Sequence, residues 1–100
     1  MRARTDEHEQ KLMKEFELER QLKALANRRR LTILNILRKR KEVNVSDISD
    51  MIKLSLTSTS KHLNILERTG VVEKEQRSLN VYYRIASSTP NHISRLLAVL

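Results

Sequence analysis

The spacing of apolar residues along this chain changes at Gly70, the only glycine. Before Gly70 apolar residues recur every three or four positions, which is typical of amphipathic helices. After it, the period changes to two: residues 71–76 and 80–85 are predicted to form paired strands, and the second alternates Val81, Tyr83 and Ile85 with Tyr82 and Arg84. A single glycine and a single proline also argue against a loop-rich or all-β chain. The sequence therefore predicts a mostly α-helical fold with one small β-hairpin.

Four helices are predicted before Gly70. Asn27, Ser46 and Ser55 are residue types that cap helix N-termini, and each precedes an apolar run with helical spacing. The third and fourth helices are separated by about three residues, which is the signature of a helix-turn-helix, and Lys53 stands where that turn often has glycine. The predicted helices cover residues 5–26, 28–40, 47–52 and 56–69, with a short strand possible at 42–45 and with Ile48, Met51 and Ile52 directed inward.

The segment after Gly70 is predicted to form the hairpin and one last helix. The connection Arg77-Ser78-Leu79 lacks the Asn-Gly or Gly-Gly pair of a tight turn, so we expect a longer, mobile tip. Thr89 followed by Pro90 predicts a cap and a first helical residue, because proline is favoured at that position. The apolar residues that follow share one helical face, which predicts a helix over residues 90–100.

Charge and composition restrict the class of function. Twenty Lys and Arg against twelve Asp and Glu give a net charge of +8, which indicates a polyanionic partner such as nucleic acid, although a solvated basic surface is the alternative. The absence of cysteine excludes disulfides, thiolate zinc sites and cysteine nucleophiles. No apolar stretch approaches the roughly 18 residues of a membrane span, and no signal peptide follows Met1. We expect a cytoplasmic protein with no membrane partner.

Three motifs together point to a family. They are LKALANRRRLTILNIL at residues 22–37, LSLTSTSKHLNILERTGVV at 54–72 and NVYYRI at 80–85. In kind and in order they resemble the ArsR/SmtB family of winged helix-turn-helix repressors, over about residues 20–86. The resemblance implies one domain over residues 1–100, with an N-terminal helix at 5–26, the helix-turn-helix at 46–69, the wing at 71–86 and a C-terminal dimerisation helix at 90–100.

The recognition helix of such a fold would begin with an unusual set of residues. Five of the six residues from 55 to 60 carry hydroxyls, although serine and threonine are mediocre helix formers. Short hydroxyls at a helix N-terminus can donate to phosphates and to base acceptors. Thr59, Leu63 and Leu66 would hold the helix to the core, leaving the opposite face for the DNA groove. The predicted DNA-binding residues are Ser55, Leu56, Thr57, Ser58, Ser60, Lys61 and Asn64 on the helix and Lys74, Arg77, Ser78 and Asn80 in the wing.

Three positions in this segment, Leu56, Thr59 and His62, bear on the resemblance to the family. Leu56 departs from the family, which commonly has glutamine there, so base reading at this position should differ. Thr59 departs as well, because the family usually has an aliphatic residue. His62 matches a common family histidine, and either a hydrogen-bonded structural role or DNA contact is open. Exposed hairpins often carry lysine and arginine, so a purely structural role is also open for the wing residues.

The terminal helices carry more apolar surface than a 100-residue monomer should bury, which predicts a homodimer, as the resemblance also implies. The predicted dimerisation residues are Leu12, Met13, Phe16, Ile93, Leu96, Leu97 and Leu100. Many members of the family sense metals, but Asn44 and Ser46 stand where thiolates would bind, and His92 has Ser94 beside it in place of a second ligand. We therefore expect no metal and no cofactor, and leave an unknown effector open.

These observations predict a sequence-specific regulator that binds double-stranded DNA as a homodimer on an inverted repeat, most simply as a repressor. The main alternative is a winged helix that binds protein or RNA, and Leu56 is the residue that favours it. An enzyme is not expected, because Ser60 and His62 would point apart on a helix and no glycine-rich phosphate loop is present.

Overall fold

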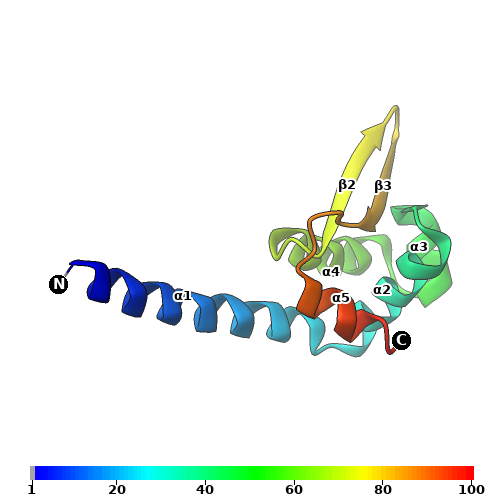
Figure 1. Ribbon diagram of the computed structural model, residues 1–100. Helices are drawn as coiled ribbons and strands as arrows, with labels where there is room; N and C mark the ends of the chain where they lie inside the picture. The colour runs from blue at the N-terminus through cyan, green and yellow to red at the C-terminus, as the bar shows by residue number, and fades with distance from the viewer. Residues whose placement is uncertain (1) are drawn as a thin grey trace.

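The computed structural model describes residues 2–100, with side chains for Glu9 and from Leu12 onward. Its elements follow the predicted order (Figure 1). They are α1 (Arg2–Leu25), α2 (Arg28–Arg40), β1 (Val43–Asn44), α3 (Val45–Ile52), α4 (Leu56–Arg68), β2 (Val72–Arg77), β3 (Asn80–Ile85) and α5 (Asn91–Leu97). The prediction of a mostly helical winged helix-turn-helix fold is confirmed.

Helix α1 projects from the rest of the molecule (Figure 1). The chain measures 55 × 30 × 21 Å and has a radius of gyration of 15.7 Å, against about 13 Å for a compact chain of this length. Within the described part of α1, the buried side chains are Gln21, Ala24 and Leu25, near its C-terminal end. Most of the other side chains described in α1, from Leu12 onward, are therefore uncovered in the single chain.

The N-terminal caps of α2 and α4 are the predicted ones. The Asn27 side chain accepts a hydrogen bond from the Arg30 N–H, and Ser55 accepts one from the Ser58 N–H. The prediction that Ser46 caps α3 is wrong. Asn44 lies at the end of β1 with extended backbone, and its side chain accepts from the Asp47 N–H, so α3 begins one residue before Ser46. Lys53 closes α3 in the left-handed conformation (φ 55°), as its place in the turn suggested.

The three strands form one antiparallel sheet in the order β1-β3-β2. Val43 pairs with Tyr83, and Arg77 at the end of β2 pairs with Asn80 at the start of β3. The expected longer tip is therefore wrong, because only Ser78 and Leu79 connect the strands. Ser78 has φ 58°, and a positive φ at the first of two central residues is what a tight hairpin turn needs, usually from glycine.

The last helix is shorter than predicted. Pro90 occupies the cap position, and the Ile93 and Ser94 N–H groups donate to its carbonyl. The Thr89 hydroxyl does not cap the helix, since it donates to the carbonyl of Ala86 at 2.6 Å. After Leu97 the backbone continues as a tightened turn, in which the Leu100 N–H donates to the Leu97 carbonyl.

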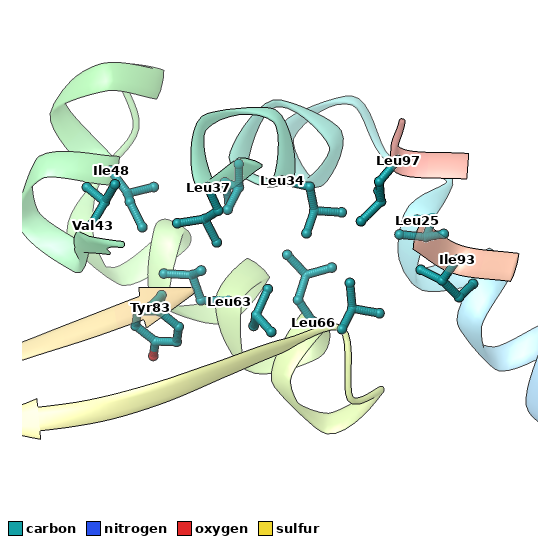
Figure 2. Packing of buried hydrophobic residues seen from close by; sticks show 13 residues of the cluster. Leu25, Leu34, Leu37, Val43, Ile48, Leu63, Leu66, Tyr83, Ile93 and Leu97 are labelled. Atoms are coloured by element: carbon teal, nitrogen blue, oxygen red, sulfur yellow. The ribbon is translucent and has the colours of Figure 1, made fainter. Parts of the chain in front are cut away.

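The core surrounds one face of α4 (Figure 2). Leu34 and Leu37 of α2 lie on one side of Leu63 and Leu66, and Tyr83 of the sheet lies on the other side near Leu63. The same cluster includes Ile48 of α3 at one end and Leu25, Ile93 and Leu97 at the other. The prediction that Met51 points inward is wrong: Met51 is 39% exposed, and Ile48 is the residue of α3 that is fully buried among the predicted three. The core thus fixes which face of α4 is left to solvent.

Candidate nucleic-acid interface

The solvent face of α4 carries most of the residues that the sequence singled out. Thr59, Leu63 and Leu66 are fully buried on the core side. On the other side Leu56, Thr57, Lys61 and Asn64 are exposed, while Ser58 and Ser60 are half-buried. The packing therefore brings a short row of hydroxyl, amide and ammonium groups to one surface, together with the half-exposed apolar side chain of Leu56.

The first turn of α4 has backbone donors to offer. The Thr59 N–H donates to the Ser55 carbonyl, and the Ser58 N–H donates to the Ser55 hydroxyl at 3.1 Å. The N–H groups of Leu56 and Thr57 precede these bonds and have no partner within the helix, as is general for a first turn. Such donors, with the positive end of the helix dipole, favour an anionic group.

The predicted wing residues Lys74, Arg77, Ser78 and Asn80 are all exposed. Lys74 is close to α4, because its Nζ lies 3.6 Å from Glu67 Oε1. Ser78 and Asn80 flank Leu79, whose side chain is 95% exposed at the tip. Lys74 and the tip residues therefore project from the hairpin into solvent, with Lys74 next to the recognition helix.

The Arg77 side chain forms hydrogen bonds with two carboxylates of the protein. Its Nη1 and Nη2 donate to the two carboxylate oxygens of Glu42 at 2.6 and 2.9 Å, and it also forms two bonds with Glu75. Its guanidinium carbon lies 4.8 Å from the centroid of the Tyr82 ring, a cation–π distance. The hydrogen bonds from Arg77 lower the pKa of both Glu42 and Glu75 and raise the pKa of Arg77.

Arg84 extends this arrangement on the same face of the sheet. It donates to Glu73 at 2.9 Å and to Glu75 and Glu42 at 3.2 Å each. We call the five charged residues Glu42, Glu73, Glu75, Arg77 and Arg84 the wing ion network. Three carboxylates and two guanidinium groups leave this network with a net charge of −1.

His62 is hydrogen-bonded within the protein. Its Nδ1 lies 3.2 Å from Arg30 Nη1, and because a guanidinium only donates, Nδ1 must be the unprotonated acceptor. Desolvation, with the nearby charges of Arg30 and Arg29, lowers the pKa of His62. The Arg30 Nε donates to the Ala24 carbonyl at the end of α1, so Arg30 ties α1 and α2 to the recognition helix.

The sequence interpretation missed Arg20, Arg30 and Glu42. Arg20, held by Glu17 at 2.8 Å, donates to the carbonyl of Arg68 at the end of α4. The spacing of Glu17 and Arg20 allows a local pair on a helix, but the bond from Arg20 to α4 joins residues 48 positions apart. No local pattern distinguishes Arg30 from its neighbours in the run of three arginines or joins Glu42 to Arg77.

The positions examined for metal ligands have other partners. Asn44 caps α3, and the Ser46 carbonyl accepts from the Ser49 hydroxyl at 2.8 Å. His92 Nε2 lies 2.8 Å from the Gln21 side-chain oxygen. Over the residues described, no group of three or more His, Cys, Asp and Glu side chains is placed to hold a metal ion.

The predicted dimerisation residues divide into two sets. Leu12, Met13 and Phe16 on α1 are 52%, 72% and 67% exposed, and Leu96 and Leu100 are partly exposed near the C-terminus. Ile93 and Leu97, in contrast, are buried in the chain's own core, where they pack near Leu25 (Figure 2). These two residues therefore stabilise the single chain and are not free for a partner. Among the described helices, none is both long and apolar enough to cross a membrane.

Comparisons with known proteins agree with this geometry. A family model described as "Bacterial regulatory protein, arsR family" matches residues 27–74. The chain is 37% identical over 76 residues to the transcriptional activator HlyU of Vibrio cholerae, covering 76% of this chain and 69% of that protein. It is 36% identical over 76 residues to the transcriptional repressor PagR of Bacillus anthracis, covering 76% of each.

A solved structure extends the likeness to the fold. The homodimeric winged helix-turn-helix DNA-binding domain of a possible ArsR-family regulator from Mycobacterium bovis matches with a TM-score of 0.77 at 36% identity, covering 89% of this chain and 79% of that one. The chain belongs to this arsR family of bacterial regulatory proteins, which are DNA-binding transcriptional regulators and not enzymes.

Proposed function

We propose that the protein acts as a homodimer that binds an inverted-repeat operator and represses transcription from it, without control by metal ions. The observation that carries this proposal is the solvent face of α4. Thr57, Lys61 and Asn64 are exposed on this face, and the first turn of α4 adds backbone N–H groups that have no partner within the helix. The opposite face of α4 is buried in the core. Side chains of these types on a helix match the donors and acceptors of the major groove.

Each part of this surface has its own role in the proposal. Leu56, Thr57, Ser60, Lys61 and Asn64 meet base edges or adjacent phosphates. Ser55 and Ser58, with the first-turn N–H groups, hold a phosphate at the helix N-terminus. In the wing Lys74, Ser78 and Asn80 contact the DNA backbone. Arg77, the remaining residue predicted from the sequence, already has the carboxylates of Glu42 and Glu75 as partners.

The uncovered apolar side chains of α1 support the homodimer. Leu12 and Phe16 are four residues apart and so share a helix face, with Met13 close beside them. Leu96, Val99 and Leu100 add exposed apolar surface at the other terminus. The relative from Mycobacterium bovis, which matches most of this chain, is homodimeric. Two copies that bury these side chains against each other would present two α4 helices related by a two-fold axis.

The direction of regulation and the independence of metal rest on different grounds. Repression is the simplest consequence of occupying an operator, and PagR is a repressor, whereas HlyU is an activator. Metal independence is supported by the donor set, because amide and hydroxyl groups at Asn44 and Ser46 bind soft metal ions poorly. A reporter placed behind the operator, with and without added zinc, tests both statements.

The direct test of the function is selection of bound sequences from a random duplex library. The expected result is an inverted repeat with half-site centres roughly 10 bp apart, and binding that weakens steeply with salt. If no duplex is enriched and affinity does not change with salt, the operator proposal fails. A winged helix that binds protein or RNA, which the exposed Leu56 favours, would then take its place.

A further inference from the structure

The guanidinium of Arg77 is nearly saturated with partners inside the protein. Its Nε and Nη2 donate to Glu75, and its Nη1 and Nη2 donate to Glu42. Four of the five N–H donors of an arginine are therefore in use. The guanidinium carbon also lies over the Tyr82 ring, 4.8 Å from its centroid. The side chain is still 45% exposed, but only one of its N–H donors remains to meet a phosphate.

These contacts span all three strands of the sheet. Arg77 ends β2, Tyr82 lies in β3, and Glu42 immediately precedes β1, 35 residues away in sequence. Because β1 contains only two residues, its backbone pairing with β3 is limited to Val43 with Tyr83 and Asn44 with Tyr82. The Arg77–Glu42 hydrogen bonds thus link the outer part of the hairpin to the segment that joins α2 to β1. We call this side-chain link the tie.

We infer that Arg77 is a positioning residue, which Glu42 holds across the sheet so that the wing keeps its angle to the recognition helix, and that it does not contact phosphate. This inference rests on the proposed DNA-binding function, since the angle of the wing decides whether Lys74 and the tip reach the DNA backbone. The charge of the surroundings agrees with it. The wing ion network carries a net charge of −1 and would repel a phosphate at this face.

The two roles of Arg77 predict opposite effects of changing Glu42. If Arg77 binds phosphate, Glu42 competes with the DNA for it, and Glu42→Gln should tighten binding. If Arg77 is a tie, Glu42→Gln should loosen the wing and weaken binding, although it removes a negative charge. Arg77→Lys also distinguishes the two roles of Arg77. Lysine keeps the positive charge but cannot bridge two carboxylates as the planar guanidinium of arginine does.

The experiment measures the affinity of the full chain for the duplex selected by the wild type, using Glu42→Gln, Arg77→Lys and the double variant. Each single variant should lose about two- to fivefold in affinity, the range expected for a partly exposed ion pair. The double variant should be no worse than either single variant, because both remove the same tie. Glu73→Gln is the matched control: it removes the same charge from the same face, but Glu73 contacts Arg84 and not Arg77, so this variant should bind at least as tightly as the wild type does.

Hydrogen exchange of the protein without DNA gives a second readout. The amides of β2 and β3 should exchange faster in Glu42→Gln and Arg77→Lys than in the wild type. Tighter DNA binding by Glu42→Gln, wild-type affinity of Arg77→Lys, or unchanged exchange in both variants would overturn the inference. If the wild type itself binds no duplex, the proposed function fails, and the exchange measurement still decides whether Glu42 and Arg77 hold the wing.

Discussion

Thr59 is an unusual residue in the interface between recognition helix and core. Its side chain is fully buried, and its hydroxyl oxygen has no hydrogen-bond partner among the described residues. A buried hydroxyl without a partner lowers stability, whereas a methyl group of similar shape does not. Valine is the natural replacement, because it has the same branching at Cβ.

We predict that Thr59→Val raises the free energy of unfolding by about 1 kcal/mol, as measured by urea denaturation. Thr57→Val, an identical change on the exposed face of the same helix, is the control and should have little effect. A clear loss of stability in Thr59→Val would mean that the hydroxyl has a partner, such as an internal water.

His62 makes stability depend on pH in a defined direction. Its pKa is lowered in the folded chain by desolvation and by Arg30 and Arg29, so the unfolded chain binds a proton more readily. Below a pH of about 6.5 the proton therefore favours unfolding, and the stability present above that pH is lost as the pH falls. His62→Gln keeps an oxygen acceptor for Arg30 but cannot titrate.

The urea midpoint of the wild type should accordingly fall between pH 7.5 and 5.5 by more than that of His62→Gln. Equal falls in the two proteins would show that another group controls this pH range. The same comparison with DNA present separates two roles, since a His62 that contacts phosphate would strengthen binding as the pH falls.

At the level of helices and strands, the sequence predicts what local chemistry controls. The starts of α2 and α4, the two hairpin strands and the buried face of α4 follow from cap residues and apolar spacing, and they are confirmed. The errors lie where local signals compete. Ser46 was predicted as the cap of α3, but Asn44, two residues earlier, is also a capping residue type, and the end of β1 gives it the extended backbone of a cap.

Substituting alanine at Asn44 and at Ser46 therefore tests which residue caps α3. Asn44→Ala should lower stability by about 1 kcal/mol, because the Asp47 N–H loses its acceptor. Ser46→Ala should have a much smaller effect, since the Ser46 side chain is exposed and only its backbone carbonyl accepts a bond. Thermal unfolding of both variants measures this difference, and a larger loss in Ser46→Ala would restore the cap predicted from the sequence.

Much of the candidate site depends on pairings between distant residues, which the sequence could not supply. The solvent face of α4 was predictable, because helical spacing alone separates it from Thr59, Leu63 and Leu66. The Arg77–Glu42 contact was not predictable, since it depends on β1 lying beside β3. A lysine or arginine in an exposed hairpin can face a phosphate or a carboxylate, and only its tertiary neighbours decide which.

For the molecule as a whole, the oligomeric state is expected to depend on the exposed apolar face of the projecting helix α1. Phe16 is 67% exposed and belongs to the apolar face of α1 proposed for the dimer. We predict that Phe16→Glu shifts the protein to a monomer at tens of micromolar, because two buried carboxylates would have no partner charge. Sedimentation equilibrium measures this shift.

Leu79→Glu is the matched control for that change. Leu79 is 95% exposed at the tip of the wing, so the same charge placed there should leave the dimer intact. A wild-type protein that sediments as a monomer, or a Phe16→Glu variant that remains a dimer, would exclude this face as the contact between copies.

The central claim, that the solvent face of α4 reads DNA sequence, is tested most directly by a specificity ratio. This is the affinity for the selected operator divided by the affinity for a scrambled duplex at the same salt concentration. Thr57→Ala and Ser60→Ala should each reduce the ratio by about fivefold, or roughly 1 kcal/mol, the low end for a base contact, while affinity for the scrambled duplex stays unchanged. Ser87→Ala, an exposed serine outside α4, should leave the ratio as it is. A ratio that neither α4 variant changes, or a wild type that binds both duplexes equally, would contradict the claim.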